Sequence, residues 1–88
     1  MTNKHPHNQH IYACLGQVIN LRRKRLKISQ EELAEHAGVD RAFISNVERG
    51  KRNPSFGIIA SIATGLKMRY SRLVAKCEKC VDARQKTG

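Results

Sequence analysis

The stretch that most constrains the fold of this chain is Gln30–Val47, QEELAEHAGVDRAFISNV. Apolar residues recur at helical spacing on both sides of Gly38, separated by polar or charged residues: Leu33, Ala34, Ala37, Val39, Ile44 and Val47. A residue just past a helix end commonly adopts the left-handed conformation, which Gly takes without a steric penalty from a Cβ atom. The pattern therefore predicts two short, half-buried helices joined by a tight turn at Gly38.

Capping residues indicate where these two helices begin. Ser29 is followed three residues later by Glu32, the S-x-x-E pattern in which each side chain accepts a hydrogen bond from the other residue's backbone N–H. Asp40 is a typical N-cap for a second helix that runs from Arg41 to about Arg49. Two short helices with this spacing form a helix-turn-helix.

The same residues carry a family resemblance. Gln30, Ala34, Gly38, Ile44 and Val47 hold the first, fifth, ninth, fifteenth and eighteenth places of an eighteen-residue frame, as they do in the phage-repressor and Cro-type (XRE) helix-turn-helix proteins. The segment Glu48–Ser55, ERGKRNPS, is similar to one that many of these proteins carry, and the resemblance covers Leu15–Val74. It implies an all-α, lambda-repressor-like bundle of about five helices that binds double-stranded DNA.

The second helix of the motif offers residues that can read bases. Its outward positions by the helical period are Arg41, Ala42, Ser45, Asn46 and Arg49. In repressor-like docking this helix enters the major groove. Arg41 can then contact guanine, Ala42 a thymine methyl group, Asn46 an adenine, and Ser45 a base or a phosphate. Contact with phosphate alone is the alternative for Arg41.

The resemblance also implies residues that contact the DNA backbone and one structural ion pair. The phosphate contacts are Gln30, Phe43, Arg49, Lys51, Arg52 and Asn53. Phe43 stands where relatives often have tyrosine, so it lacks a hydroxyl and would pack against a sugar or against the core. A solvated turn is the alternative for Lys51–Asn53. Arg23 matches an arginine that pairs in this family with a glutamate, here Glu48, and would hold the first helix against the recognition helix.

The rest of the chain divides into an arm, one domain and a tail. Residues 1–10 lack periodicity and are expected to form a flexible arm; residues 11–80 form the domain, and residues 81–88 a polar, fraying tail. A first helix is predicted from Ile11 to Leu26 or Lys27. Ser55 caps another helix, which ends at Gly65 and supplies core residues: Phe56, Ile58, Ile59, Ala60, Ile62, Ala63 and Leu66.

The last predicted helix lacks a clear start, because Lys67 and Arg69 stand where relatives have a turn residue and a cap. Its apolar residues either complete the core or form a dimerisation surface: Met68, Tyr70, Leu73, Val74 and Cys77.

Composition limits the function further. Seventeen Lys and Arg against seven Asp and Glu give a net charge of +10, which favours a polyanionic partner. No run approaches the ~20 apolar residues of a membrane span, and the N-terminus lacks the apolar core of a signal peptide, so a cytoplasmic protein is expected. Three cysteines, an odd number, favour reduced thiols. Cys77 and Cys80 form a C-x-x-C, and His5, His7 and His10 lie close in sequence, but these do not make a four-ligand zinc set and we expect no metal.

These observations predict a transcriptional regulator that binds a palindromic operator as a homodimer, because one recognition helix reads too few base pairs for specificity. It would repress by occupying a promoter or activate by holding RNA polymerase nearby. Restriction–modification controllers and phage-type repressors are the most similar kinds. No cofactor and no enzymatic site are indicated. Two alternatives stay open: an antitoxin-like interaction module that regulates its own synthesis, and a regulator switched by a metal or by thiols.

Overall fold

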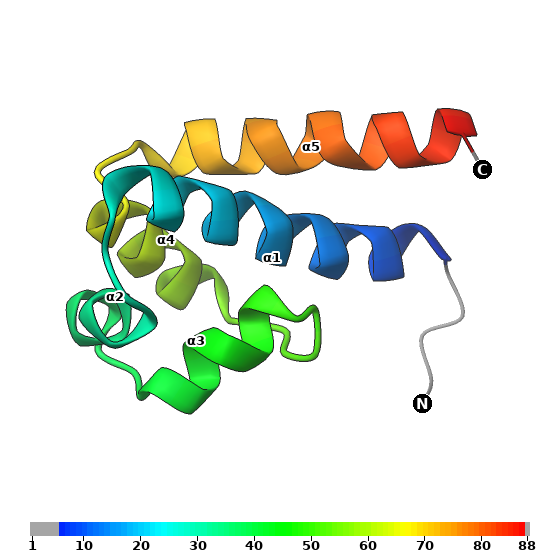
Figure 1. Ribbon diagram of the computed structural model, residues 1–88. Coiled ribbons are helices and arrows are strands. Elements are labelled where there is room, and N and C mark those ends of the chain that lie inside the picture. Colours follow the sequence, from blue (N-terminus) through cyan, green and yellow to red (C-terminus); the bar gives the residue numbers. More distant parts are fainter. Residues whose placement is uncertain (1–5, 88) are drawn as a thin grey trace.

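The computed structural model describes residues 6–87, with side chains from His10 to Gln85. Over this range the chain forms five helices and no strands: α1 (Pro6–Leu26), α2 (Gln30–Ala37), α3 (Arg41–Glu48), α4 (Phe56–Gly65) and α5 (Tyr70–Thr87). The expected all-α bundle with a central helix-turn-helix, α2 and α3, is confirmed (Figure 1).

Helix α1 lies in the middle of the molecule. Helix α5 runs antiparallel along one side of α1, and α3 packs against the other side (Figure 1). Helix α2 contacts both α3 and α4. The largest fully buried side chains come from all five helices: Ile19, Leu33, Ile44, Ile62, Leu66 and Leu73 among them. Because α1 contacts both α3 and α5, a shift of α1 would change the packing of both helices.

The caps of the helix-turn-helix form as the sequence predicts. The Ser29 hydroxyl accepts from the backbone N–H of Glu32, and the Glu32 carboxylate accepts from the backbone N–H of Ser29. Asp40 accepts from the backbone N–H of Phe43 at 2.8 Å. Gly38 has φ = 72°, in the left-handed region where a Cβ atom would be strained. These local interactions fix the turn that aims α3.

Both ends of the chain are more helical than the sequence indicates. Helix α1 begins at Pro6, so the arm expected over residues 1–10 is wrong for residues 6–10; a proline is well accommodated in a first helical turn. Helix α5 continues to Thr87, so residues 81–87 are not a fraying tail. No Gly or Pro interrupts this segment, and Val81 is only 4% exposed. Residues 1–5 and 88 lie outside the described range.

The core prediction for α4 needs a correction at Phe56. Ile62, Ala63 and Leu66 are buried, but Phe56 is 71% exposed and Ala60 is also exposed. Helical side chains point toward the N-terminus, so a side chain in the first turn projects past the end of the core. The Phe56 ring instead lies edge-on to Tyr70, with ring centroids 4.8 Å apart.

The turn between α4 and α5 forms without glycine. Lys67 takes φ = 56°, in the left-handed region, although it is not a typical residue for that conformation. The Arg22 guanidinium of α1 donates from Nε to the carbonyl of Leu66 at 2.9 Å and from Nη2 to that of Lys67 at 3.1 Å. These bonds satisfy carbonyls past the end of α4 and hold the turn against α1.

Candidate nucleic-acid interface

Helix α3 buries one side and presents the other. Ile44 and Val47 are 0% and 1% exposed, whereas none of the five outward positions is buried. Arg41 and Ala42, in the first turn of α3, are exposed, and Ser45 and Asn46 are half-buried. The side that the sequence assigns to base contacts is therefore at the surface, with an arginine at its N-terminal end.

Arg49, just past the end of α3, is hydrogen-bonded to Asn46. Its Nη2 donates to the amide oxygen of Asn46 at 2.6 Å. An asparagine that reads adenine accepts from N6 through this same oxygen while it donates to N7. For Asn46 to pair with an adenine, the Arg49–Asn46 bond would have to open or be shared.

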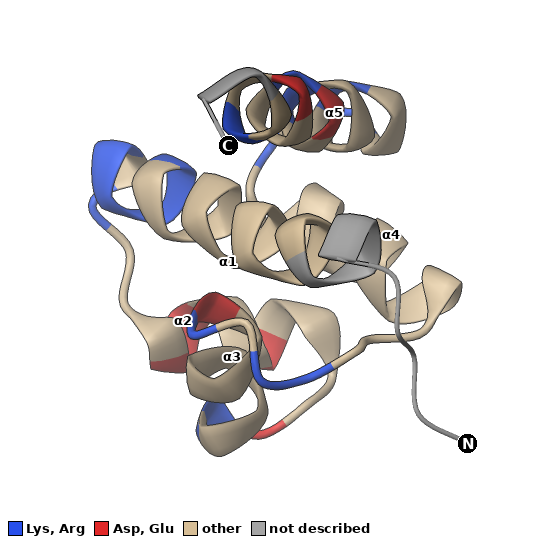
Figure 2. Ribbon diagram, turned by 90° about the vertical axis from the view of Figure 1, so that its right-hand side faces the viewer, with Lys and Arg blue, Asp and Glu red and all other residues tan. Residues whose placement is uncertain are grey.

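The loop after α3 carries exposed basic residues. Lys51, Arg52 and Asn53 are all exposed, and Figure 2 shows the Lys and Arg of this loop beside α3. The Arg52 guanidinium carbon lies 4.9 Å from the centre of the Phe43 ring, a cation–π contact. Phe43 is itself half-buried against the core. Phe43 thus holds Arg52 beside α3.

Gln30, expected at a phosphate, turns its side chain inward. Its Nε2 donates to Oε1 of Glu48 at 3.1 Å, and the residue is half-buried. A phosphate at the start of α2 would then be bound by backbone N–H groups and the helix dipole rather than by this amide.

The Glu48 carboxylate joins three helices at the C-terminal end of α3. Arg23 of α1 donates from Nε to Oε2 at 2.7 Å and from Nη2 to Oε1 at 3.1 Å, so the expected ion pair is present and bidentate. Asn20 of α1 donates to Oε1 at 2.8 Å, and Gln30 of α2 donates to the same atom. The Arg23 side chain is 11% exposed and that of Glu48 is 4% exposed. This Glu48 cluster (Asn20, Arg23, Gln30 and Glu48) fixes α3 relative to α1 and α2.

The cluster keeps Glu48 ionised. Burial by itself would raise the pKa of Glu48, but the hydrogen bonds from Arg23, Asn20 and Gln30 outweigh it and hold the pKa below the ordinary value of 4.5. The hydrogen bond to Glu48 raises the pKa of Arg23, against the opposing effect of burial. A carboxylate whose pKa is lower in the folded state stabilises the fold above its unfolded pKa, and this stabilisation is lost as the pH falls.

We therefore expect Glu48→Gln to flatten the acid dependence of stability. The wild-type free energy of unfolding should fall from about pH 5 to pH 3 as Glu48 takes up a proton, and the variant should lack this part of the slope. Urea unfolding at a series of pH values measures it. Glu35→Gln, at an exposed position of α2, is the control and should keep the wild-type slope. Equal slopes in wild type and Glu48→Gln would contradict the lowered pKa.

Comparison with known proteins decides the family. The helix-turn-helix family matches residues 19–73, from the middle of α1 into α5 and more than half of the chain. The chain belongs to the XRE-type helix-turn-helix family. The resemblance carried by Gln30–Val47 is thereby confirmed, and α2 and α3 form the helix-turn-helix of this family.

Three XRE-type relatives illustrate the range of the family. The immunity repressor protein of Bacillus phage phi105 is 34% identical over 62 residues, 70% of this chain and 43% of the repressor, so this chain spans less than half of that relative. The restriction-modification controller protein C.AhdI from Aeromonas hydrophila is 37% identical, with a TM-score of 0.68 over 70% of this chain and 94% of that one. The controller protein C.Esp1396I, solved as a tetramer in complex with its natural 35 base-pair operator, is 27% identical, with a TM-score of 0.73 over 81% and 93% of the two chains.

Two glycines allow the close contacts around α3 in this XRE-type chain. Gly50 is the turn-forming glycine expected after α3, whereas Gly16 was not predicted from the sequence. A Cβ atom on the buried Gly16 of α1 would lie 2.5 Å from the carbonyl oxygen of Val47 and closer still to that of Glu48. Gly50, with φ = 74°, brings the loop after α3 against the backbone of Ala13. Gly16, Asn20 and Arg23 share one face of α1, and this spacing is the signal that could have identified Gly16 and Asn20 beside Arg23.

The two cysteines of the C-x-x-C, Cys77 and Cys80, do not act as a pair in the structure. Cys14 of α1 forms a disulfide with Cys80 of α5, and Cys77 is a buried free thiol, so the expectation of reduced thiols is wrong for Cys14 and Cys80. Within a helix, Cβ atoms three residues apart lie about 5–6 Å from each other, too far for a disulfide, which needs about 3.5–4.5 Å. The packing of α1 on α5 instead brings the Cα atoms of Cys14 and Cys80 to 5.8 Å.

The structure brings no metal-ligand set together in the part of the chain that it describes, where no three His, Cys, Asp or Glu side chains are grouped suitably for an ion. His5 and the side chain of His7 lie outside that part. Among the helices described, none has the length and apolar character of a membrane span.

The five residues proposed for dimerisation separate into two groups. Leu73 is fully buried and Cys77 is 9% exposed, both within the core of this chain. This corrects their assignment to a dimer surface, because a side chain in the chain's own core offers no free surface to a second copy. Val74 is 43% exposed, and Met68 and Tyr70 are half-buried, so only these three remain for contact with a partner.

Proposed function

We propose that this XRE-type chain is a sequence-specific transcriptional regulator that binds a palindromic operator as a homodimer, with α3 in the major groove. The observation that carries the proposal is the exposed first turn of α3, where Arg41 and Ala42 project from a helix whose other side is buried. The Glu48 cluster holds the far end of α3, so the outward side is presented in a fixed orientation.

Two kinds of contact divide the work of binding. Exposed cations, above all Lys51 and Arg52 in the loop after α3, supply a sequence-independent attraction to phosphates that weakens as salt increases. Arg41 contacts guanine O6 and N7 together, and Asn46 reads an adenine once Arg49 releases its amide oxygen. Phosphate contacts set the register of the helix, and these few side chains choose the sequence.

The dimer is proposed to form through the N-terminal part of α5. Val74 and Tyr70 lie on this part, and Phe56, 71% exposed at the start of α4, contacts Tyr70 and extends the apolar surface. A two-fold pair of recognition helices reads two half-sites about one helical turn, roughly 34 Å, apart. The tetramer of C.Esp1396I in complex with its operator supports the proposal that copies of this chain assemble on DNA.

The biological role proposed is that of a controller or phage-type repressor acting in the cytoplasm without catalysis. The protein represses by occupying a promoter, or activates by holding RNA polymerase nearby. The similarity to C.AhdI over nearly all of that chain supports the role of a controller. The similarity to the phage immunity repressor supports the role of a repressor.

Selection of bound sequences from random DNA tests the proposal. Wild type should yield a palindrome, and Arg41→Ala should lose about 1–3 kcal/mol of binding free energy and relax the base choice at one position of each half-site. Arg52→Ala should weaken all sequences about equally and reduce the salt dependence, because it contacts phosphate.

Lys76→Ala, which removes the same charge from α5, is the control and should bind nearly as wild type does. Equal, sequence-blind losses from Arg41→Ala and Arg52→Ala would remove Arg41 from base reading. A selection that enriches no sequence would overturn the proposed function.

A further inference from the structure

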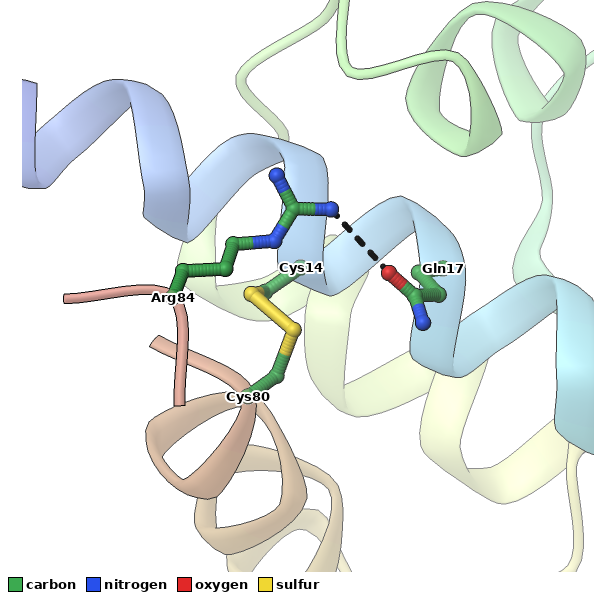
Figure 3. The surroundings of a disulfide bond; sticks show 4 residues. All are labelled: Cys14, Gln17, Cys80 and Arg84. Carbon is green, nitrogen blue, oxygen red and sulfur yellow. Dashed lines mark hydrogen bonds between the residues drawn. A yellow bond between two sulfur atoms is a disulfide. The ribbon is translucent and has the colours of Figure 1, made fainter. Parts of the chain in front are cut away.

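The Cys14–Cys80 disulfide covalently joins α1 to α5. The two residues are 66 positions apart in sequence, and Figure 3 shows the bond where the two helices lie side by side. Arg84, one turn after Cys80, donates from Nη2 to the side-chain oxygen of Gln17 at 3.1 Å (Figure 3). The C-terminal half of α5 is thus attached to the middle of α1 by both a covalent bond and a hydrogen bond.

The same turn of α1 supports the recognition helix. Cys14 lies between Ala13, whose backbone is against Gly50, and Gly16, which packs on the last carbonyl groups of α3. On one side this turn therefore contacts the end of α3 and the start of the basic loop, and on the other it carries the disulfide to α5 (Figure 1). This turn of α1 therefore contacts both α5 and the end of α3.

We propose that the Cys14–Cys80 disulfide is a reversible redox switch that raises the affinity of this chain for its operator when oxidised. The inference rests on the proposed function, since it concerns the regulation of the same DNA-binding surface. In the oxidised state α1 is fixed between α5 and α3. The oxidised chain therefore loses less conformational entropy than the reduced chain when DNA binding orders α3 and the loop after it, so it binds more tightly. Reduction leaves the apolar packing of Leu73 and Val81 in place but frees the two helices to move apart near Cys14.

A small-molecule disulfide such as oxidised glutathione can close the switch by two exchange steps. Cys80 is the accessible partner, because it is half-buried and lines an open groove between α1 and α5, whereas Cys14 is 0% exposed. The Cys80 thiolate attacks the disulfide, which forms a mixed disulfide and releases one thiol. The Cys14 thiolate then attacks the Cys80 sulfur and releases the second thiol. Two protein thiols become one disulfide, and the small disulfide is reduced to two thiols.

Cys77 stays outside this exchange. It is buried in the core, and burial raises the pKa of its thiol to about 11, so little thiolate is present at neutral pH. Cys77 therefore supplies a matched control within the same molecule, one turn of α5 away from Cys80.

The first experiment counts thiols. The full chain is treated with oxidised glutathione or with dithiothreitol, denatured without reductant, alkylated with iodoacetamide and analysed by peptide mass spectrometry. One alkylated cysteine, Cys77, is expected after oxidation and three after reduction. Alkylated Cys14 and Cys80 after oxidation would overturn the switch.

The second experiment measures the melting temperature and the operator affinity of both states. Reduction should lower the wild-type melting temperature by about 10–20 °C, since the bond closes a long loop. It should also weaken operator binding roughly fivefold or more. Cys80→Ala should be indifferent to reductant in both measurements, and Cys77→Ala should respond as wild type does.

The outcomes distinguish failure of the redox switch from failure of the proposed DNA-binding function. Operator binding of equal affinity in oxidised and reduced wild type would overturn the switch and leave the proposed function standing. A reductant response retained in Cys80→Ala would overturn it as well. Absence of any operator preference in the oxidised chain would overturn the proposed function, and with it the effect of the disulfide on DNA binding.

Discussion

Replacing Arg23 by alanine is expected to lower the free energy of unfolding by about 3–5 kcal/mol at neutral pH. The side chain of Glu48 is 4% exposed, and without Arg23 its charge keeps only the hydrogen bonds from Asn20 and Gln30. A buried charge that loses its partner must either remain unpaired or take up a proton, and both are costly. For a domain of this size the melting temperature should fall by at least about 10 °C.

Arg25→Ala is the matched control, because Arg25 lies on the same helix and is exposed. It should change the unfolding free energy by less than about 0.5 kcal/mol. The double variant Arg23→Ala with Glu48→Ala should be less unstable than the sum of the two single changes, since it leaves no unpaired charge. Simple additivity, or an unchanged melting temperature in Arg23→Ala, would show that the ion pair does not hold α1 to α3.

Gly16→Ala is the second change with a large expected effect. The added Cβ atom would lie 2.5 Å from the carbonyl oxygen of Val47, and backbone atoms at the end of α3 cannot move aside as a flexible side chain would. Overpacking of this kind costs about 1–3 kcal/mol or more. The substitution should also displace α3 from α1, so operator affinity should fall beyond what the loss of folded protein explains.

Gly57→Ala provides the control for Gly16→Ala. Gly57 is also helical, but a Cβ atom there would meet nothing within 4 Å. Alanine has the higher helix propensity, so Gly57→Ala should be neutral or slightly stabilising. Thermal unfolding of the two variants compares them directly. If both glycines tolerate alanine equally, α1 does not approach α3 as closely as the structure shows.

These two variants concern the same interface between α1 and α3. Arg23 and Gly16 both lie on α1, and their contacts with the end of α3 determine how the outward side of α3 is oriented. A helix of eight residues such as α3 has little stability of its own, so its position depends on the contacts at its buried side. Either variant is therefore expected to bind the operator more weakly, although neither substitution removes a residue proposed to contact DNA.

The sequence by itself determined the local features of the helix-turn-helix. The caps at Ser29 and Asp40 and the left-handed Gly38 depend on residues within a few positions of each other, so spacing alone identifies them. The outward side of α3 follows from the helical period and the burial of Ile44 and Val47. The Arg23–Glu48 pair was available only through the family resemblance, because 25 residues separate its members.

Only the tertiary structure determined the side-chain contacts between helices that are far apart in the sequence. It turned Gln30 inward to Glu48, placed Leu73 and Cys77 in the core and left Phe56 at the surface. It also joined Cys14 to Cys80 rather than Cys77 to Cys80. Each of these outcomes depends on which helix lies beside which and how closely the two approach. Helical periodicity gives the direction of a side chain on its own helix, but not the residue that it meets on another.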